Sequence, residues 1–199
     1  MNKNRMETFS DGVIAIIITI MVLELHVPES PDWASLKPLI PVFITYVMSF
    51  IYLGIYWNNH HHIVQAHENV NGKALWANLH LLFWLSLVPF VTGWMGENNF
   101  APLPTAAYGT VLLLTGLAYT ILQNVLVGIE GPRSDLAKAV GKDPKEWISV
   151  GLYAVAVPLA FLNTWISGAI YVLVVILWLI PDPRIEARIQ NDPPDGKQG

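Results

Sequence analysis

The side chains best suited to metal chemistry are the histidines. Three of them form the run His60-His61-His62, and His67 and His80 follow. Imidazole nitrogens bind transition metals, and membrane di-iron oxygenases and desaturases use several such histidine boxes. The chain has six histidines in all, and Glu68 is the one acid at helical spacing from them. Because no cysteine supplies a thiolate either, we expect no metal site, and a membrane metal-dependent enzyme is only the weakest alternative.

A second group of polar side chains, Arg5, Ser10 and Asp11, precedes the apolar run from Val13 to Leu23. In a helix, Ser10 or Asp11 would cap the N-terminus and complement its dipole, while Arg5 would lie among lipid headgroups. A carboxylate at the edge of a membrane is stable only when it has partners. We therefore expect Asp11 to bind either its own helix end or polar groups on neighbouring helices.

The overall composition places these groups in a membrane protein. Hydrophobic residues make up 53% of the 199 residues and charged residues 13%, and eight residues are tryptophan. One small core could not hide this much apolar surface from water, so lipid is the expected solvent. The net charge of −4, with no basic stripe, argues against nucleic acid as a partner.

Six apolar stretches predict six transmembrane helices, so that residues 1–199 form a single all-α polytopic membrane domain. The last two stretches are short and are separated only by Asn163 and Thr164, which predicts a tight helical hairpin. The predicted spans are about 9–25, 41–57, 74–95, 105–129, 147–162 and 165–180.

The basic residues predict how these spans are oriented. With an even number of spans, both termini share one side with ten of the eleven Lys and Arg residues, and Lys37 alone lies on the other side. The positive-inside rule then places both termini in the cytoplasm. Glu29, Asp32 and Glu97 in the outer loops would attract cations to the outer mouth.

The first predicted helix has two different faces. At about 100° per residue, Ile16, Ile20 and Leu23 fall on one narrow apolar stripe beside Thr19, and Asp11 points about 140° away. The stripe could face lipid, with Asp11 toward the protein interior, or it could line an axis shared between subunits. Periodicity alone allows both arrangements.

A secondary transporter is the main alternative to a channel. Transporters bind their substrate near the middle of the membrane, often at an acid or a broken helix and between inverted repeats. Glu24, near the outer end of the first helix, and Pro158, in the fifth, are the only candidates for such a site. Neither has a counterpart elsewhere in the chain, so the sequence gives this class little support.

Three segments in the first half of the chain carry a recognisable pattern. They are Arg5, Phe9, Ser10 and Asp11 in the order Arg-x-x-x-Phe-Ser-Asp, Tyr-Trp-Asn-Asn-His-His at 56–61, and Trp-Ala-Asn-Leu at 76–79 followed by Leu-Val-Pro-Phe at 87–90. In this order they resemble the bacterial branch of the lysosomal/endosomal transmembrane potassium channel family. The resemblance is close over the first three spans and rests on span count and spacing beyond them.

The resemblance implies a homotetramer of six-helix chains, whose pore is lined by the first helix of each subunit and has no re-entrant filter loop. It implies a passive, potassium-permeable cation channel of modest selectivity in a bacterial inner membrane. No cofactor is expected, and the expected partners are further copies of the chain, the lipid bilayer and permeant monovalent cations.

The resemblance also implies roles for individual residues. Ile16 would form the narrowest ring of a hydrophobic gate, Ile20 and Leu23 would lie further outward, and Thr19 is a candidate for selectivity. The motif residues and their partners on the second and third spans would form an interhelical network that comprises Arg5, Phe9, Ser10, Asp11, Trp57, His60, His61 and Asn78.

Overall fold

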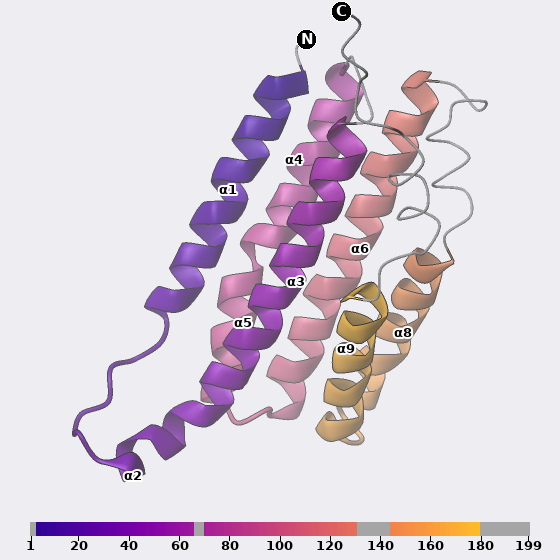
Figure 1. The fold of residues 1–199 in the computed structure, drawn as a ribbon. Coiled ribbons are helices and arrows are strands. Elements are labelled where there is room, and N and C mark those ends of the chain that lie inside the picture. Colours follow the sequence, from indigo (N-terminus) through magenta and orange to yellow (C-terminus); the bar gives the residue numbers. More distant parts are fainter. Residues whose placement is uncertain (1–2, 66–69, 131–143, 180–199) are drawn as a thin grey trace, which may run out of the picture.

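The computed structural model describes residues 3–65, 70–130 and 144–179, and the regular structure within these ranges is entirely helical (Figure 1). The helices are α1 (Lys3–Leu23), α2 (Trp33–Leu36), the short 3-10 helix η1 (Lys37–Leu39), α3 (Ile40–Gln65), α4 (Gly72–Ser86), α5 (Val88–Glu97), α6 (Pro102–Glu130), α8 (Lys145–Leu159) and α9 (Thr164–Leu179). The predicted all-α class is confirmed for the described part of the chain.

Four stretches are long and apolar enough to cross a membrane, namely Lys3–Leu23, Trp33–Gln65, Gly72–Glu97 and Pro102–Ile129. They overlap the first four predicted spans. The fifth and sixth predicted spans overlap α8 and α9, which have 15 and 16 residues. At 1.5 Å per residue these two helices are only about 22–24 Å long, less than the roughly 30 Å of a bilayer core. A total of six spans therefore remains a prediction.

The third membrane-length stretch consists of two helices that meet at Leu87. Pro89 lies in the first turn of α5, where it has no N–H to donate to the Leu85 carbonyl. The Leu87 N–H donates to the Trp84 carbonyl, three residues earlier, at 3.2 Å, and α4 ends there. The sequence predicted one uninterrupted apolar span here, and the proline explains why the helix is broken within it.

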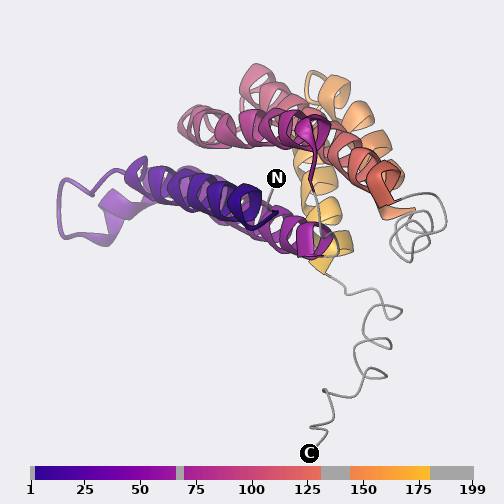
Figure 2. The same cartoon turned by 90° about the horizontal axis from the view of Figure 1, so that it is seen from above.

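Helix α1 lies at one edge of the bundle, where it packs against α3, α4 and α5 (Figures 1 and 2). The hairpin of α8 and α9 lies at the opposite edge against α6 and α3. Tyrosines tie this hairpin to the bundle, because Tyr52 donates to the Tyr171 carbonyl at 2.6 Å and Tyr171 donates to the Thr105 carbonyl at 3.1 Å. The α8–α9 hairpin is therefore fixed to α3 and α6, on the side of the bundle away from α1.

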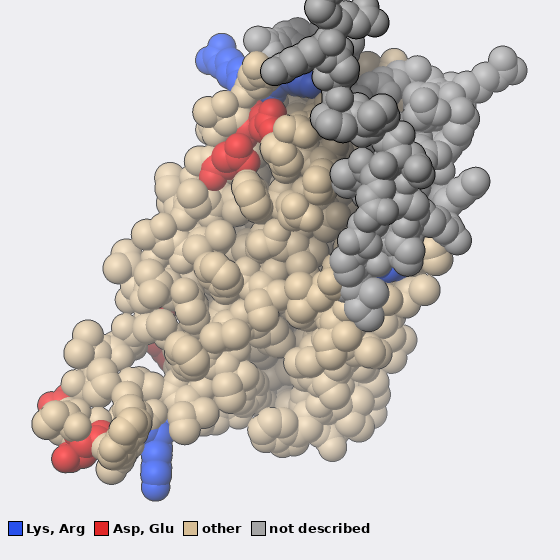
Figure 3. All heavy atoms as spheres, viewed as in Figure 1, with Lys and Arg blue, Asp and Glu red and all other residues tan. Residues whose placement is uncertain are grey.

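Charged side chains on the face shown in Figure 3 gather mostly toward the two ends of the molecule, and a broad uncharged band lies between them. This distribution suits a bilayer, because charged groups are rarely stable at the level of the hydrocarbon. Together with the four membrane-length stretches, it identifies an integral membrane protein.

Candidate functional site

Helix α1 has a buried face and an exposed face, as its sequence predicts. Met6, Ser10, Ile14, Ile17 and Met21 are buried against the neighbouring helices. The predicted stripe lies on the other side, where the exposed fractions of Ile16, Ile20 and Leu23 are 59%, 42% and 77%. The described part of the chain therefore leaves these large apolar side chains largely exposed.

The exposed stripe borders an open groove of about 800 Å³ between α1 and the α4–α5 pair. Ile16 and Ile20 line it from α1, Ser86 and Phe90 line it from the other wall, and two acids, Glu24 and Glu97, line it as well. Its described lining includes no basic residue. Glu24 lies directly over α5, because a side chain added at Gly93 would meet its carboxylate at 3.9 Å.

Thr19 lies on the exposed side of α1 next to Ile20. Its hydroxyl donates to the Ala15 carbonyl at 2.8 Å, the backbone bond that threonines in membrane helices often form. The hydroxyl proton is thus engaged, while the oxygen lone pairs remain able to accept. Gly12, one turn before Ile16, is also exposed, and no atom would contact a side chain added there.

On its buried side, α1 is joined to α3 and α4 by a chain of hydrogen bonds with a fixed direction. The Ser10 hydroxyl donates to the Met6 carbonyl at 2.9 Å, so it accepts from Nδ2 of Asn78 at 2.9 Å. This leaves Oδ1 of Asn78 to accept from Nε2 of His60 at 2.8 Å. All three side chains are buried, which makes each bond costly to lose.

Asp11 lies beside this chain of bonds. Its Oδ1 accepts a hydrogen bond from the indole N–H of Trp57 at 3.0 Å, and Trp57 is a residue of the expected interhelical network. His61 pairs with Glu7 at 2.9 Å, and its ring stacks on Trp57. Asn78, which bonds both Ser10 and His60, is therefore the centre of the link between the three helices.

Two other motif residues lie outside the described network. Arg5 is exposed and forms no hydrogen bond or ion pair with any residue that the structure describes. Phe9 is 53% exposed, on the same side of α1 as Ile16 two turns further along. Glu7 was not predicted to take part, although its position four residues before Asp11 places both acids on one helix face.

The histidines do not converge on a metal site in the described ranges, which contain no group of three or more metal-ligating side chains. His80 accepts from the Trp84 indole on its own helix, away from His60. His67 and Glu68 lie outside the described residues. His60, His61 and His80 therefore have separate partners: Asn78, Glu7 and Trp84.

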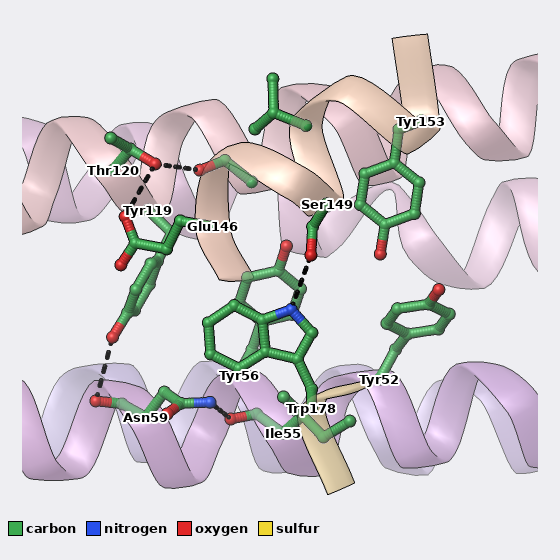
Figure 4. Close-up of a pocket in the computed structure, with 12 residues that line it drawn as sticks. Tyr52, Ile55, Tyr56, Asn59, Tyr119, Thr120, Glu146, Ser149, Tyr153 and Trp178 are labelled. Atoms are coloured by element: carbon green, nitrogen blue, oxygen red, sulfur yellow. Dashed lines mark hydrogen bonds between the residues drawn. The ribbon is translucent and has the colours of Figure 1, made fainter. Parts of the chain in front are cut away.

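A second cavity, of about 30 Å³, lies between α3, α6, α8 and α9 (Figure 4). Its walls carry four tyrosines, Tyr52, Tyr56, Tyr119 and Tyr153, together with Glu146. The Tyr119 hydroxyl donates to the Asn59 carbonyl at 3.3 Å, and Trp178 donates to Ser149 at 2.9 Å across the hairpin. This space holds one or two water molecules at most and lies away from α1.

The first part of the chain matches a known family model. Residues 5–89 match the model described as endosomal/lysosomal potassium channel TMEM175. This range includes α1, α3, α4 and the start of α5, and hence the exposed stripe and the hydrogen-bonded network.

Longer relatives extend the likeness over nearly the whole chain. A protein of Chryseobacterium sp. named as a potassium channel is 53% identical over 192 residues, which cover 96% of this chain and all of the relative. A potassium channel of Streptomyces collinus is 29% identical and covers 94% of this chain and 98% of the relative.

A solved structure shares the fold. The crystal structure of a lysosomal potassium-selective channel TMEM175 homolog from Chamaesiphon minutus matches with a TM-score of 0.77 and 27% identity. The match covers 89% of this chain and 96% of that chain. With the Chryseobacterium relative, these matches confirm the expected family, and the chain belongs to the TMEM175 channel family.

Proposed function

We propose that this protein is a passive, potassium-permeable cation channel of modest selectivity, whose gate is a hydrophobic constriction on α1. The observation that carries the proposal is the exposed stripe of Ile16, Ile20 and Leu23 on a helix whose other face is held by buried hydrogen bonds. The bacterial relatives from Chryseobacterium and Streptomyces are named as potassium channels, which supports the choice of ion.

The proposed pore forms between subunits of a homotetramer. Helix α1 lies at an edge of the bundle and its apolar stripe is exposed among the described residues, so copies related by a symmetry axis can bring these stripes together. Each chain would contribute one six-helix domain, residues 1–199, with α8 and α9 as the fifth and sixth spans. No re-entrant filter loop is proposed.

The proposed gate works by excluding water. A ring of isoleucine side chains that is too narrow for a hydrated ion expels water and raises a barrier, and a small rotation of the helices widens it. Ile16 would be the narrowest ring, with Ile20 and Leu23 further outward. Without a cage of carbonyl oxygens, discrimination among cations should be modest, and Thr19 could add a preference through its hydroxyl oxygen.

We also propose the orientation and the membrane. Among described residues, Lys3, Arg5 and Lys73 lie at the end that carries the N-terminus, and Lys37 follows α2 at the other end. The positive-inside rule then places both termini in the cytoplasm of a bacterium, with the channel in the inner membrane. Glu24 and Glu97, on the groove beside the stripe, would enrich cations toward its outer end.

A secondary transporter is the second candidate, and one observation favours it. The break between α4 and α5 at Leu87 is a discontinuous helix within a membrane-length stretch, a feature of many transporter binding sites. Ser86 and Pro89 at this break line the same groove as Glu24. An enzyme is not supported, because the family and its named relatives are ion channels.

Flux through purified protein separates the two candidates. The protein is reconstituted into potassium-loaded liposomes, and potassium efflux is measured after the liposomes are diluted into potassium-free buffer without an added ionophore. Single-channel currents are then recorded from the same protein. We expect passive potassium flux with resolvable unitary currents, at rates far above carrier turnover. Flux that requires a coupled ion gradient, or no passive cation flux at all, would reject the channel.

A further inference from the structure

A groove between α4 and α6, at the end of the molecule that carries the N-terminus, has the features of a lipid site. It has a volume of about 870 Å³ and is lined by Asn71, Gly72, Lys73, Trp76, Ala77, His80, Ile121 and Val125. We propose that this groove binds an anionic phospholipid of the cytoplasmic leaflet, with its phosphate at Lys73 and an acyl chain along Ile121 and Val125.

The polar side of the groove is a single helix face. Lys73, Trp76 and His80 stand at positions i, i+3 and i+7 of α4, so their side chains line up along one side over about 10 Å. All three are exposed, and the exposed fraction of the Trp76 side chain is 76%. This order offers an ammonium group at the helix end, then an indole, then an imidazole.

The tautomer of His80 adds a second hydrogen-bond donor. The Trp84 indole N–H donates to Nε2 of His80 at 2.9 Å, so Nε2 is an acceptor and neutral His80 carries its proton on Nδ1. A donor at this position suits a phosphate or ester oxygen. Lys73 and His80 together supply two donors, two helical turns apart, to an elongated polar headgroup.

The charge of the groove also favours an anion. Its lining in the described chain includes Lys73 and no acid, whereas the groove beside α1 contains Glu24 and Glu97 and no base. A single basic residue near an anionic membrane surface is worth a measurable gain in affinity for anionic lipid. The opposite wall, Ile121 and Val125, stands at i and i+4 on α6 and offers only apolar surface.

The groove lies at the expected level of the headgroups. Helix α6 has 29 residues and is about 43 Å long, so about 13 Å of it extends beyond a hydrocarbon core of roughly 30 Å. The Thr120 hydroxyl on this helix donates to the carboxylate of Glu146, at the charged start of α8, at 3.5 Å. Ile121 and Val125 follow Thr120 within the last third of α6, and across the groove Asn71, Gly72 and Lys73 mark the start of α4. The groove therefore lies near the helix ends, where headgroups are expected.

The inference goes beyond the proposed function, because the groove contains no residue of α1 and needs neither conduction nor a tetramer. It shares with that proposal the embedding of the chain in a membrane and the orientation that places the N-terminus in the cytoplasm. A binding measurement on the purified protein therefore tests it even if the channel proposal fails.

Native mass spectrometry of the purified full chain in detergent tests the site. Phosphatidylglycerol and phosphatidylcholine with identical acyl chains are added in turn, and the retained lipid is counted. We expect the protein to retain phosphatidylglycerol in preference to phosphatidylcholine. Lys73→Gln should weaken phosphatidylglycerol retention about fivefold, and Lys73→Arg should restore it. Trp76→Ala should weaken retention of both lipids.

Matched controls lie at the other end of the molecule. Lys37→Gln removes another exposed lysine and Trp33→Ala another exposed tryptophan, and neither should change retention. Equal retention of the two lipids, or an equal loss in Lys37→Gln, would overturn the proposal. A change in oligomer mass on Lys73→Gln, without loss of lipid, would overturn it in favour of a second copy of the chain as the occupant.

Discussion

Neighbouring residues on α1 have different surroundings because successive side chains of a helix point about 100° apart. Ile16 is exposed at 59% and Ile17 at 4%, although they are adjacent and chemically identical. The first can form a constriction with other copies of the chain, while the second holds α1 in its own bundle. Substitutions at the two positions should therefore have different effects.

A polar side chain at Ile16 tests the gate. Ile16→Asn should raise resting potassium leak by about tenfold or more, because an amide wets a ring that would otherwise expel water. Leak is measured in liposomes at equal protein content. Ile176→Asn, an exposed isoleucine on α9 at 50%, is the control and should leave leak unchanged. Unchanged leak in Ile16→Asn would move the gate elsewhere.

Asn78 is the residue whose loss should most weaken the buried network. Asn78→Leu removes the acceptor of His60 and the donor to Ser10 together, so we expect a loss of about 1–3 kcal/mol in the free energy of unfolding. Unfolding is followed by denaturant titration in micelles. Asn98→Leu, at an exposed asparagine whose side chain donates to the Trp94 carbonyl on its own helix end, should cost far less. Similar losses in the two variants would contradict a central role for Asn78.

The pairing within this network could not be predicted from the sequence. Ser10, His60 and Asn78 carry polar groups on predicted spans, so their burial required partners, and three such groups on three helices could be expected to meet. Asp11 lies on the flank of α1, where the long side chain of Trp57 reaches it. Such reach depends on side-chain rotamers, which spacing along the chain does not specify.

The helices meet closely where small residues allow it. Gly96 on α5 faces α3, and a Cβ there would lie 2.6 Å from the Cα of Val42 and 2.6 Å from the Thr45 hydroxyl. The contact holds the outer half of α5 against the start of α3. Gly93, one turn earlier on α5, is the residue that lies next to the Glu24 carboxylate.

Gly96→Ala should therefore push α5 away from α3. We expect it to destabilise the protein by about 1–3 kcal/mol, as overpacking against backbone typically does, in the same denaturant titration. Gly151→Ala on α8, where no atom lies within 4 Å of the added carbon, is the control and should be neutral or slightly stabilising. If both substitutions are tolerated, the helices are not in this close contact.

The positions of the helices follow from apolar length, but their continuity does not. Four stretches appear where the sequence predicted spans, since 20 or so apolar residues are stable across a membrane only as helix. The break at Leu87 could have been predicted from Pro89. Helices α8 and α9 border residues 131–143 and 180–199, which lie outside the described ranges, so the six-span count still rests on the sequence.

At the scale of the whole molecule, α1 lies at an edge of the bundle. It packs against α3, α4 and α5 on one side, and its apolar stripe is exposed on the other. A stripe facing lipid needs nothing more, and a stripe facing a symmetry axis needs further copies of the chain. The sequence alone left this choice open, and membership of a channel family favours the axis.

Substituted cysteines test this choice most directly, because the natural chain contains none. Single cysteines are placed at Ile20 and Leu23 on the stripe and at Met21 on the buried face. Currents are recorded in planar bilayers before and after a positively charged methanethiosulfonate reagent is added from the outer side. We predict that modification at Ile20→Cys and Leu23→Cys reduces potassium current and that Met21→Cys is unaffected. Currents that persist unchanged after confirmed labelling at Ile20→Cys and Leu23→Cys would show that α1 does not line the pore.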